Sequence, residues 1–155
     1  MESASLTDYA RNLIEVMPEV IRGLWKREIN ELTRGTLTPP QIFTLIYLNK
    51  MTELRMTDVA CYLSVTTAAA TGIVDRLVKA DYVSRMYDPA DRRIIRVRLT
   101  DKGMELVKKL LVHKVARIKE VFSKLSAKDR EDYLRVLTRL KDILAQESSA
   151  AAGGG

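Results

Sequence analysis

The fold is decided by residues 82–103, which read YVSRMYDPADRRIIRVRLTDKG. Side-chain character alternates over 82–86 and again over 94–99, which is typical of β-strands. The segment between them, 88–93 (DPADRR), contains turn-forming Asp and Pro residues and ends in two arginines. This stretch therefore predicts a β-hairpin with a basic tip.

Two short helices are predicted directly before the hairpin. Thr57 and Asp58 begin one that runs through Leu63, and Thr66 is the N-cap of another that runs to about Lys79. Because only two residues separate them, the connection is a tight turn. Two short helices joined in this way indicate a helix-turn-helix, and the basic hairpin that follows at once makes it a winged helix-turn-helix.

Longer helices flank this region. A first helix begins at Ser5, and we expect Pro18 to bend or split it, because proline removes one backbone hydrogen bond. The segment 38–41 (TPPQ) begins a second helix with a capping box. Two further helices are expected over 101–123 and 127–146. The fold class is therefore mainly α, with a small β-hairpin wing.

Composition limits the kinds of protein this can be. The chain has 155 residues, a net charge of +6 and a hydrophobic content of 46%, which excludes intrinsic disorder. No apolar run approaches the roughly 18 residues of a membrane span. The N-terminus lacks the basic start and apolar run of a signal peptide, so we expect a cytoplasmic protein without membrane contact. One Cys and one His leave no internal disulfide and few ligands for zinc.

The positive charge is unevenly distributed. Residues 1–54 carry a net charge of −1, whereas 55–102 carry +3 and 103–155 carry +4. Within the middle third, residues 85–98 contain five arginines and no lysine. Arginine makes forked hydrogen bonds to phosphates and base edges. This arrangement, rather than the net charge, favours a nucleic-acid partner.

The helix that follows Thr66 suits the major groove of double-stranded DNA. Its first turns are built from small residues: Thr66, Thr67, Ala68, Ala69, Ala70, Thr71 and Gly72. Such a helix end approaches a duplex closely and presents free N–H groups to phosphates, and Arg76 lies one turn further on. The alternative is a buried helix kept small for close packing. The hairpin favours the DNA interpretation.

The hairpin suits the adjacent minor groove. Arg92 and Arg93 lie at its tip, and Asp91 is close enough in sequence to hold a guanidinium in position. Narrow, A·T-rich minor grooves attract inserted arginines. The alternative is a solvated hairpin whose arginines keep an edge strand soluble.

These motifs together resemble the MarR (multiple-antibiotic-resistance regulator) family of winged helix-turn-helix transcription factors. The resemblance covers about residues 6–147. It rests on LTPPQ (37–41), GIVDRLV (72–78), DPADRR (88–93) and VRLTDKG (97–103), of which the last two in succession are the most specific.

The resemblance implies a homodimer that binds a pseudo-palindrome. Recognition helices would enter successive major grooves and wing arginines the minor groove, with Asp91 and Arg93 acting together. Many members carry arginine directly after the helix threonine, where this chain has Gly72. Direct base readout at that position is therefore expected to be weaker.

The implied organisation is one MarR-type domain over residues 1–147. Helices within 6–34 and 101–147 would form the dimerisation region, 38–100 the winged helix, and 148–155 (SSAAAGGG) a flexible tail. The terminal helices carry more apolar residues than a lone winged helix can cover, which independently favours an isologous interface. The alternative is that these helices pack onto their own domain.

MarR-type proteins often release DNA when a small aromatic acid binds between the dimer helices and the winged domain. Met17, Trp25 and Tyr47 are the residues we would expect at such a site. The alternative is that they belong to the ordinary hydrophobic core, where Met and aromatic residues at helical spacing are common.

Enzyme classes lack support in the sequence. It contains no glycine-rich phosphate loop, nucleophile elbow or His-rich metal spacing, so we expect neither catalysis nor a cofactor. We expect a dimeric transcription regulator, and specifically a repressor. The alternatives are a winged-helix module that binds protein, and a regulator that responds through the thiol of Cys61. That cysteine has no basic sequence neighbour to lower its pKa, so an inert thiol is favoured.

Overall fold

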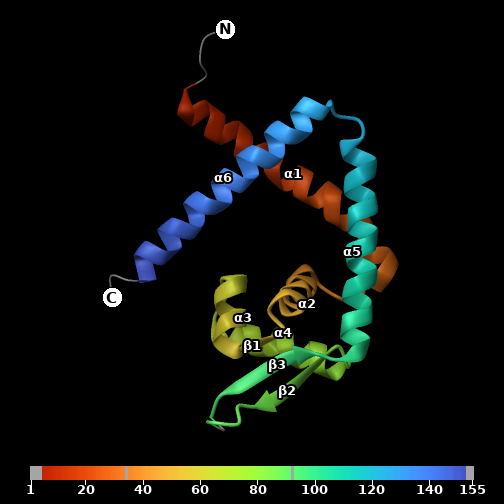
Figure 1. The fold of residues 1–155 in the computed structure, drawn as a ribbon, viewed down its shortest axis with the longest axis vertical. Helices are drawn as coiled ribbons and strands as arrows, with labels where there is room; N and C mark the ends of the chain where they lie inside the picture. Colours follow the sequence, from red (N-terminus) through yellow and green to blue (C-terminus); the bar gives the residue numbers. More distant parts are fainter. Residues whose placement is uncertain (1–4, 34, 92, 153–155) are drawn as a thin grey trace. The chain divides into compact units, whose positions relative to one another are not determined.

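The structure is a computed structural model that describes residues 5–33, 35–91 and 93–152, and for 25–33 and 148–152 it describes the backbone alone. It forms two compact units, residues 1–115 and 116–155. The elements in chain order (Figure 1) are α1 (Leu6–Thr33), α2 (Pro39–Met51), β1 (Glu53–Arg55), α3 (Met56–Leu63), α4 (Thr67–Lys79), β2 (Val83–Tyr87), β3 (Ile95–Leu99), α5 (Asp101–Phe122) and α6 (Ala127–Ala152).

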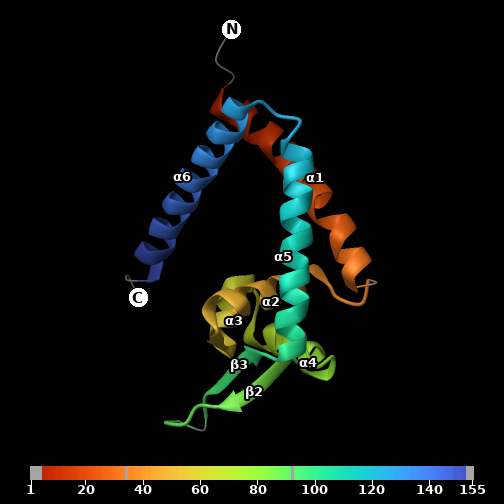
Figure 2. The same cartoon turned by 45° about the vertical axis from the view of Figure 1, so that its right-hand side comes forward.

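A three-stranded antiparallel sheet has the order β1-β3-β2. In the register of β2 with β3, Ser84 lies opposite Arg98 and Val83 opposite Leu99. Glu53 of β1 lies on the other side of Arg98. Figure 2 shows α2, α3 and α4 gathered beside the sheet, with the β2–β3 hairpin projecting away from them. The predicted mainly helical fold with a hairpin wing is confirmed, and β1 is a strand that the sequence did not predict.

The core of the first unit lies between α2, α3, α4, the sheet and the first turns of α5. Large apolar side chains that are fully buried come from each of these elements: Ile42, Leu45, Leu48, Val59, Val74, Leu77, Val83, Val97 and Val107. Burying a side chain of this size stabilises a fold by about 1.5–3 kcal/mol before conformational entropy is subtracted. The winged helix therefore has a continuous core of its own.

The predicted starts of α2 and α4 are confirmed by their caps, whereas α3 begins at Met56, one residue before the predicted Thr57. The backbone N–H of Thr38 donates to the Gln41 side chain at 2.8 Å, which is one half of a capping box. The hydroxyl of Thr66 accepts from the N–H of Ala69 at 3.2 Å. Between α3 and α4, Ser64 adopts the left-handed conformation with φ 53°, which gives the tight turn between the two helices.

The first and last helices also differ from the prediction. The first helix is not split, because α1 runs without a break through Pro18. Pro18 lacks the N–H that would bond to the carbonyl of Ile14, but this part of α1 is exposed and water can hydrate that carbonyl. At the other end α6 continues to Ala152, although we expected a flexible tail from residue 148. Alanine is the strongest helix former, and the first glycine follows only at 153.

Gly103 allows α5 to start directly against the beginning of the hairpin. The backbone N–H of Thr100 donates to the carbonyl of Tyr82 at 3.1 Å, and its hydroxyl donates to the carbonyl of Asp81 at 2.7 Å. A Cβ atom on Gly103 would collide with that same Tyr82 carbonyl oxygen. The glycine of the LTDKG motif is therefore required by close backbone approach, and it sets where the hairpin leaves the core.

None of the helices in the described ranges is by itself both long and apolar enough to cross a membrane. The α3 and α4 helices meet that length and composition only as a pair, bent by 106°. Both contribute buried side chains to the core described above.

Candidate nucleic-acid interface

Helix α4 is divided into a buried face and an exposed face. Ala70, Val74 and Leu77, spaced by four and three residues, are fully buried. The opposite face is exposed, and it includes the predicted DNA-binding residues Thr66, Thr67, Ala68, Ala69, Gly72 and Arg76. The alternative of a helix buried on all sides is therefore excluded for α4.

The first turn of α4 presents backbone N–H groups to solvent. The N–H of Ala69 donates to the Thr66 hydroxyl, and the N–H of Ala70 donates to the Thr66 carbonyl at 2.9 Å. The N–H groups of Thr67 and Ala68 come before the first intrahelical donor, Ala70, and have no helical acceptor. Thr71 is half-buried and donates its hydroxyl to the carbonyl of Thr67 at 2.8 Å. The helix end thus combines small side chains with the positive end of the helix dipole.

Arg76 lies one to two turns beyond this end on the exposed face. Its guanidinium forms no ion pair with any carboxylate that the structure describes. The neighbouring carboxylate, Asp75, is instead paired with Arg85 of β2, with 2.6 Å between Nη1 and Oδ1. This pair connects α4 to the hairpin and leaves Arg76 available to an external anion.

Backbone hydrogen bonds to aspartates shape the wing loop. The Asp91 carboxylate accepts from the backbone N–H of Arg93 at 2.9 Å, and the Asp91 carbonyl accepts from Ile94 N–H at 2.9 Å. Among the described residues Asp91 therefore contacts the backbone of Arg93, and the expected contact of Asp91 with an arginine guanidinium stays a prediction. Arg93 is exposed at the tip. Arg92, the other predicted tip residue, lies outside the described residues.

Asp88 and Arg96 hold the base of the wing. Asp88 is buried, and its carboxylate accepts from Ala90 N–H at 2.8 Å and from Arg96 Nε at 2.5 Å. A second nitrogen of Arg96 contacts Glu53 of β1 at 2.6 Å. The hydrogen bond from Ala90 and the Arg96 guanidinium lower the pKa of Asp88 below its ordinary value. This Arg96 cluster, defined as Glu53, Asp88 and Arg96, fixes the wing loop to the sheet.

Sequence reasoning missed the residues that position the interface. The Asp75–Arg85 pair joins elements ten positions apart, and the Arg96 cluster includes a strand 43 positions from Arg96. The alternation over 94–99 placed Arg96 on one strand face with Arg98, but it gave no partner for either. Only the pairing of β1 with β3 brings Glu53 to that face.

The three predicted effector residues are not brought together in one described site. Met17 is on α1 and is 41% exposed. Tyr47 is half-buried on α2, where its ring stacks on Tyr62 of α3 with centroids 3.9 Å apart. The side chain of Trp25 lies outside the described residues.

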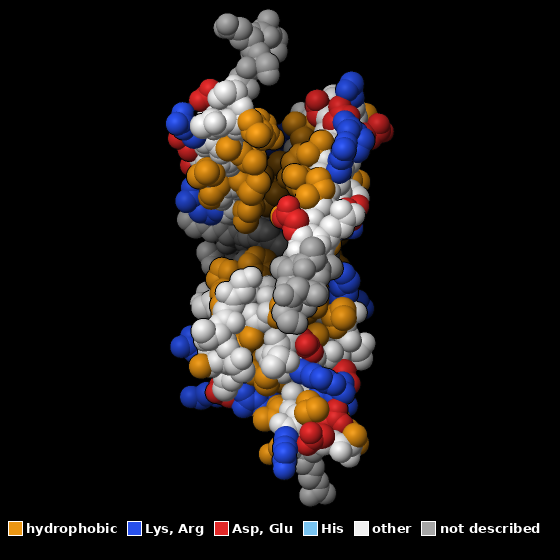
Figure 3. Space-filling model, turned by 90° about the vertical axis from the view of Figure 1, so that its left-hand side faces the viewer, with side chains coloured by type: hydrophobic (Ala, Val, Ile, Leu, Met, Phe, Trp, Pro, Cys, Tyr) orange, Lys and Arg blue, Asp and Glu red, His pale blue; other side chains and the backbone are white. Residues whose placement is uncertain are grey.

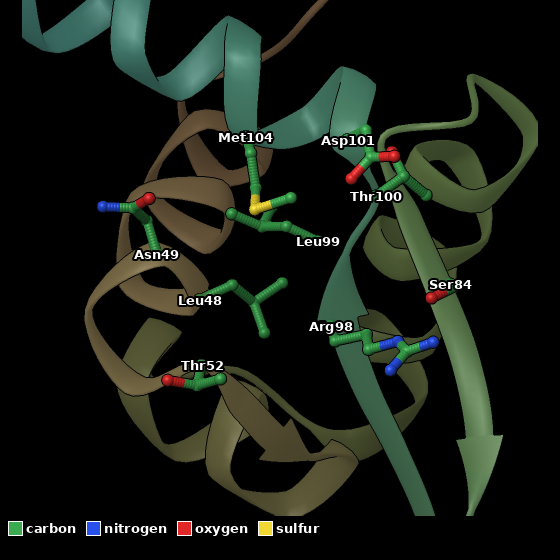
Figure 4. Close-up of a pocket in the computed structure, with 9 residues that line it drawn as sticks. All are labelled: Leu48, Asn49, Thr52, Ser84, Arg98, Leu99, Thr100, Asp101 and Met104. Carbon is green, nitrogen blue, oxygen red and sulfur yellow. The ribbon is translucent and has the colours of Figure 1, made fainter.

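A cavity of about 630 Å³ lies elsewhere, between the end of α2, the start of α5 and the outer face of the sheet. Figure 4 shows the side chains around it, including Leu48, Arg98, Asp101 and Met104. Neither Met17 nor Tyr47 lines it. Within the described part of the chain, no group of three or more His, Cys, Asp or Glu side chains is placed to hold a metal ion. Cys61 is a free, exposed thiol on α3.

Two helices joined by a tight turn, an exposed second helix and a β-hairpin held beside it define a winged helix-turn-helix protein. Comparison with known sequences gives the family: the MarR family model matches residues 37–95. The regulator BilQ of Clostridioides difficile is 31% identical over 72% of this chain and 77% of its own. The repressor YetL of Bacillus subtilis is 26% identical over 91% of this chain and 79% of its own. The chain belongs to the MarR family of transcriptional regulators.

Solved structures show the same fold. Rv1404 from Mycobacterium tuberculosis aligns with a TM-score of 0.79 at 23% identity, covering 92% of this chain and 96% of that one. A mutant MarR from Escherichia coli, complexed with operator DNA, aligns with a TM-score of 0.70 at 23% identity, covering 88% and 99%. PcaV from Streptomyces coelicolor, in complex with its natural ligand, aligns with a TM-score of 0.68 at 21% identity. The alignment covers 92% of this chain and 98% of PcaV.

Proposed function

We propose that this MarR family protein is a cytoplasmic, homodimeric repressor that binds a pseudo-palindromic operator. In this proposal α4 enters the major groove through residues 66–72 and Arg76, and Arg93 of the wing enters the adjacent minor groove. The observation that carries it is the pairing of an exposed, small-residue helix end with a basic wing in one unit. The operator complex of the E. coli relative supports it by analogy of fold, and the name of YetL supports repression.

The proposed dimer is supported by apolar surface that each chain leaves exposed. Large hydrophobic side chains on α1 and α6 face solvent, as Figure 3 shows for both helices. On α6 these include Tyr133, Leu134, Leu137, Leu140 and Leu144, all at least 41% exposed. Soluble monomers rarely expose contiguous apolar patches of such extent. A second copy of the chain would cover them in an isologous interface and place two recognition helices about 34 Å apart.

The proposed effector is a small aromatic acid that reduces DNA affinity. Its support is the ligand complex of PcaV and the family resemblance, with Met17, Trp25 and Tyr47 as the residues to examine. A thermal-shift screen of phenolic acids tests this directly, because a ligand that binds the folded state raises the unfolding temperature. If no phenolic acid in the panel shifts that temperature, a regulator without such an effector replaces this part of the proposal.

Two alternative functions can be distinguished from the proposed one by experiment. A winged-helix module that binds protein would keep its activity when the wing charge is reversed. A thiol-responsive regulator would lose DNA affinity on oxidation of Cys61, and Cys61→Ser would abolish that response. The exposure of Cys61 permits the second alternative, but the residues on either side of it in the sequence carry no positive charge that would activate the thiol.

The test of the proposal is selection of bound sequences from a random pool of duplex DNA. The proposed function predicts enrichment of an inverted repeat whose half-sites are separated by about one helical turn, roughly 10 base pairs. Enrichment without dyad symmetry would contradict the dimeric mode of binding. No enrichment at all at moderate salt would contradict specific DNA binding and leave the protein-binding module as the better interpretation.

A further inference from the structure

We propose that the cavity between α2, α5 and the outer face of the sheet, here called the sheet cavity, binds a small zwitterion, specifically an apolar α-amino acid. The sheet cavity is about 630 Å³ in volume, within the roughly 300–1,000 Å³ usual for small-molecule sites. Its walls come from four elements that belong to one compact unit. This site is separate from the residues expected for an aromatic effector.

The sheet cavity has an apolar wall that is not fully covered. Leu48 is completely buried beneath it, Leu99 is half-buried, and Met104 on the first turn of α5 is 48% exposed. In Figure 4 the side chains of Leu48, Leu99 and Met104 lie close to one another. An aliphatic or aromatic side chain of moderate size would cover Met104 and Leu99, and methionine adapts readily to such ligands.

Two charged side chains of opposite sign line the same cavity. Arg98 comes from β3 and Asp101 from the first residue of α5. Both are exposed, and neither forms a hydrogen bond or ion pair through its side chain with any residue that the structure describes. Lys102, the residue beside Asp101, donates instead to the carbonyl of Ala80 at 2.8 Å.

The register of the sheet explains why Arg98 is unpaired among the described residues. Glu53 lies directly opposite Arg98 in the β1–β3 ladder, but its carboxylate contacts Arg96 at 2.6 Å. On its other side Arg98 faces Ser84, which carries no charge and also lines the cavity. The two arginines on this strand face therefore differ, because Arg96 has two carboxylate partners and Arg98 has none in the described part of the chain.

These charges determine the class of ligand. A carboxylate would bind Arg98 but would be repelled by Asp101, whereas an amine would bind Asp101 but be repelled by Arg98. In this proposal an α-amino acid pairs its carboxylate with Arg98 and its ammonium group with Asp101, and its apolar substituent contacts Leu99 and Met104. Since β3 carries both Arg98 and the wing, we expect bound amino acid to alter DNA affinity; that consequence alone rests on the proposed function.

Calorimetric titration of the full-length protein with L-leucine, L-methionine and L-phenylalanine tests the site. We expect saturable binding of at least one of them. N-acetyl-L-leucine, which lacks the ammonium group, and 3-methylbutylamine, which lacks the carboxylate, should bind about tenfold more weakly or not at all. Arg98→Gln and Asp101→Asn should each weaken binding by about tenfold or more. Arg55→Gln is the matched control, because Arg55 lies on the same sheet but does not line the cavity.

Three results would overturn the inference: no saturable heat with any of the three amino acids at millimolar concentration, undiminished binding by Arg98→Gln, or equal binding of N-acetyl-L-leucine. The unfolding temperature of each variant confirms that it is folded before the titration. The measurement contains no DNA, so its failure leaves the proposed regulator function untouched. Loss of DNA binding would likewise leave the amino-acid site intact.

Discussion

Arg96 of β3 binds the buried carboxylate of Asp88 through Nε, at 2.5 Å from Oδ2, and so connects the first residue of the wing loop to the central strand of the sheet. The same arginine reaches Glu53 of β1. The wing that we propose to enter the minor groove is therefore held by three residues that are not among the proposed DNA contacts. Its orientation depends on this cluster.

The pH dependence of stability should report on Asp88. Its pKa is lowered in the folded protein, chiefly by the Ala90 N–H and the Arg96 guanidinium. The folded state thus binds the proton less tightly than the unfolded chain does, and the stabilisation is present above the unfolded pKa of about 3.9 and is lost as pH falls through the folded value. Asp88→Asn should be less stable than wild type at pH 7. The difference, measured by urea unfolding, should shrink between about pH 5 and pH 2; a difference independent of pH would contradict this role.

Removing the cation of the cluster should weaken DNA binding without a direct contact. Arg96→Met leaves the buried Asp88 without its charged partner, so we expect a less ordered wing and an affinity for the selected DNA lower by roughly 2- to 30-fold. Arg55→Met is the control, since Arg55 lies opposite Arg96 on β1 but forms no ion pair with a carboxylate that the structure describes. Hydrogen exchange of residues 88–95 provides the structural measurement. Unchanged exchange and affinity in Arg96→Met would show that the cluster does not position the wing.

Two glycines should respond oppositely to alanine. Gly103→Ala forces a Cβ against the Tyr82 carbonyl and requires a backbone shift, which we expect to destabilise the protein by about 1–3 kcal/mol. A Cβ at Gly72 would meet no neighbouring atom within 4 Å, and the φ of Gly72 is not positive. Gly72→Ala should therefore stabilise α4 by about 0.5–1 kcal/mol. Urea unfolding measures both, and an equal effect of the two substitutions would contradict the close approach at Gly103.

The apolar face of α6 should be required for dimerisation. Leu137 is 41% exposed, and Leu137→Glu would place a charge in the proposed interface. We expect the dimer dissociation constant to rise on the order of 100-fold or more. Lys141→Glu is the control, because it introduces the same residue on the same helix at a position that already carries a charge. This variant should keep the molecular mass of the dimer in solution. Light scattering after size-exclusion chromatography gives both masses; a dimeric Leu137→Glu protein would exclude this face.

Local patterns predicted much of this fold because the decisive interactions are local. The hydroxyl of Thr66 bonds three residues ahead, and so does the Ser126 hydroxyl, which accepts from the Asp129 N–H at 3.1 Å. These caps are visible in the sequence because side chain and backbone partner are close along the chain. The hairpin was predicted for the same reason, since its two strands flank a short turn.

Non-local pairing could not be predicted in the same way. Strand β1 has three residues, too few for an alternating pattern, and its partner lies more than 40 residues away. Without β1 there was no reason to assign Glu53 to Arg96 rather than to Arg98. The continuity of α1 through Pro18 also depends on context, because solvent exposure of that helix lowers the cost of one missing hydrogen bond.

The wing tip should contribute to affinity but not to folding. Arg93 is exposed, and its backbone rather than its guanidinium is held by Asp91. We expect Arg93→Ala to weaken binding to the selected DNA by about 1–3 kcal/mol, which is the range for specific contacts in a groove. Its unfolding temperature should match that of wild type. Wild-type affinity in this variant would show that the wing does not enter the minor groove.

The salt dependence of binding to the selected duplex, measured by fluorescence anisotropy, tests the central claim most directly. If α4 and the wing bind DNA as proposed, the logarithm of the association constant falls linearly with the logarithm of salt concentration, by roughly 0.9 for each phosphate neutralised. Several phosphate contacts per dimer predict a steep slope, and Arg76→Ala should reduce both the affinity and the slope. An affinity that does not change with salt, or that Arg76→Ala and Arg93→Ala together leave unchanged, would contradict the assignment of this surface to DNA.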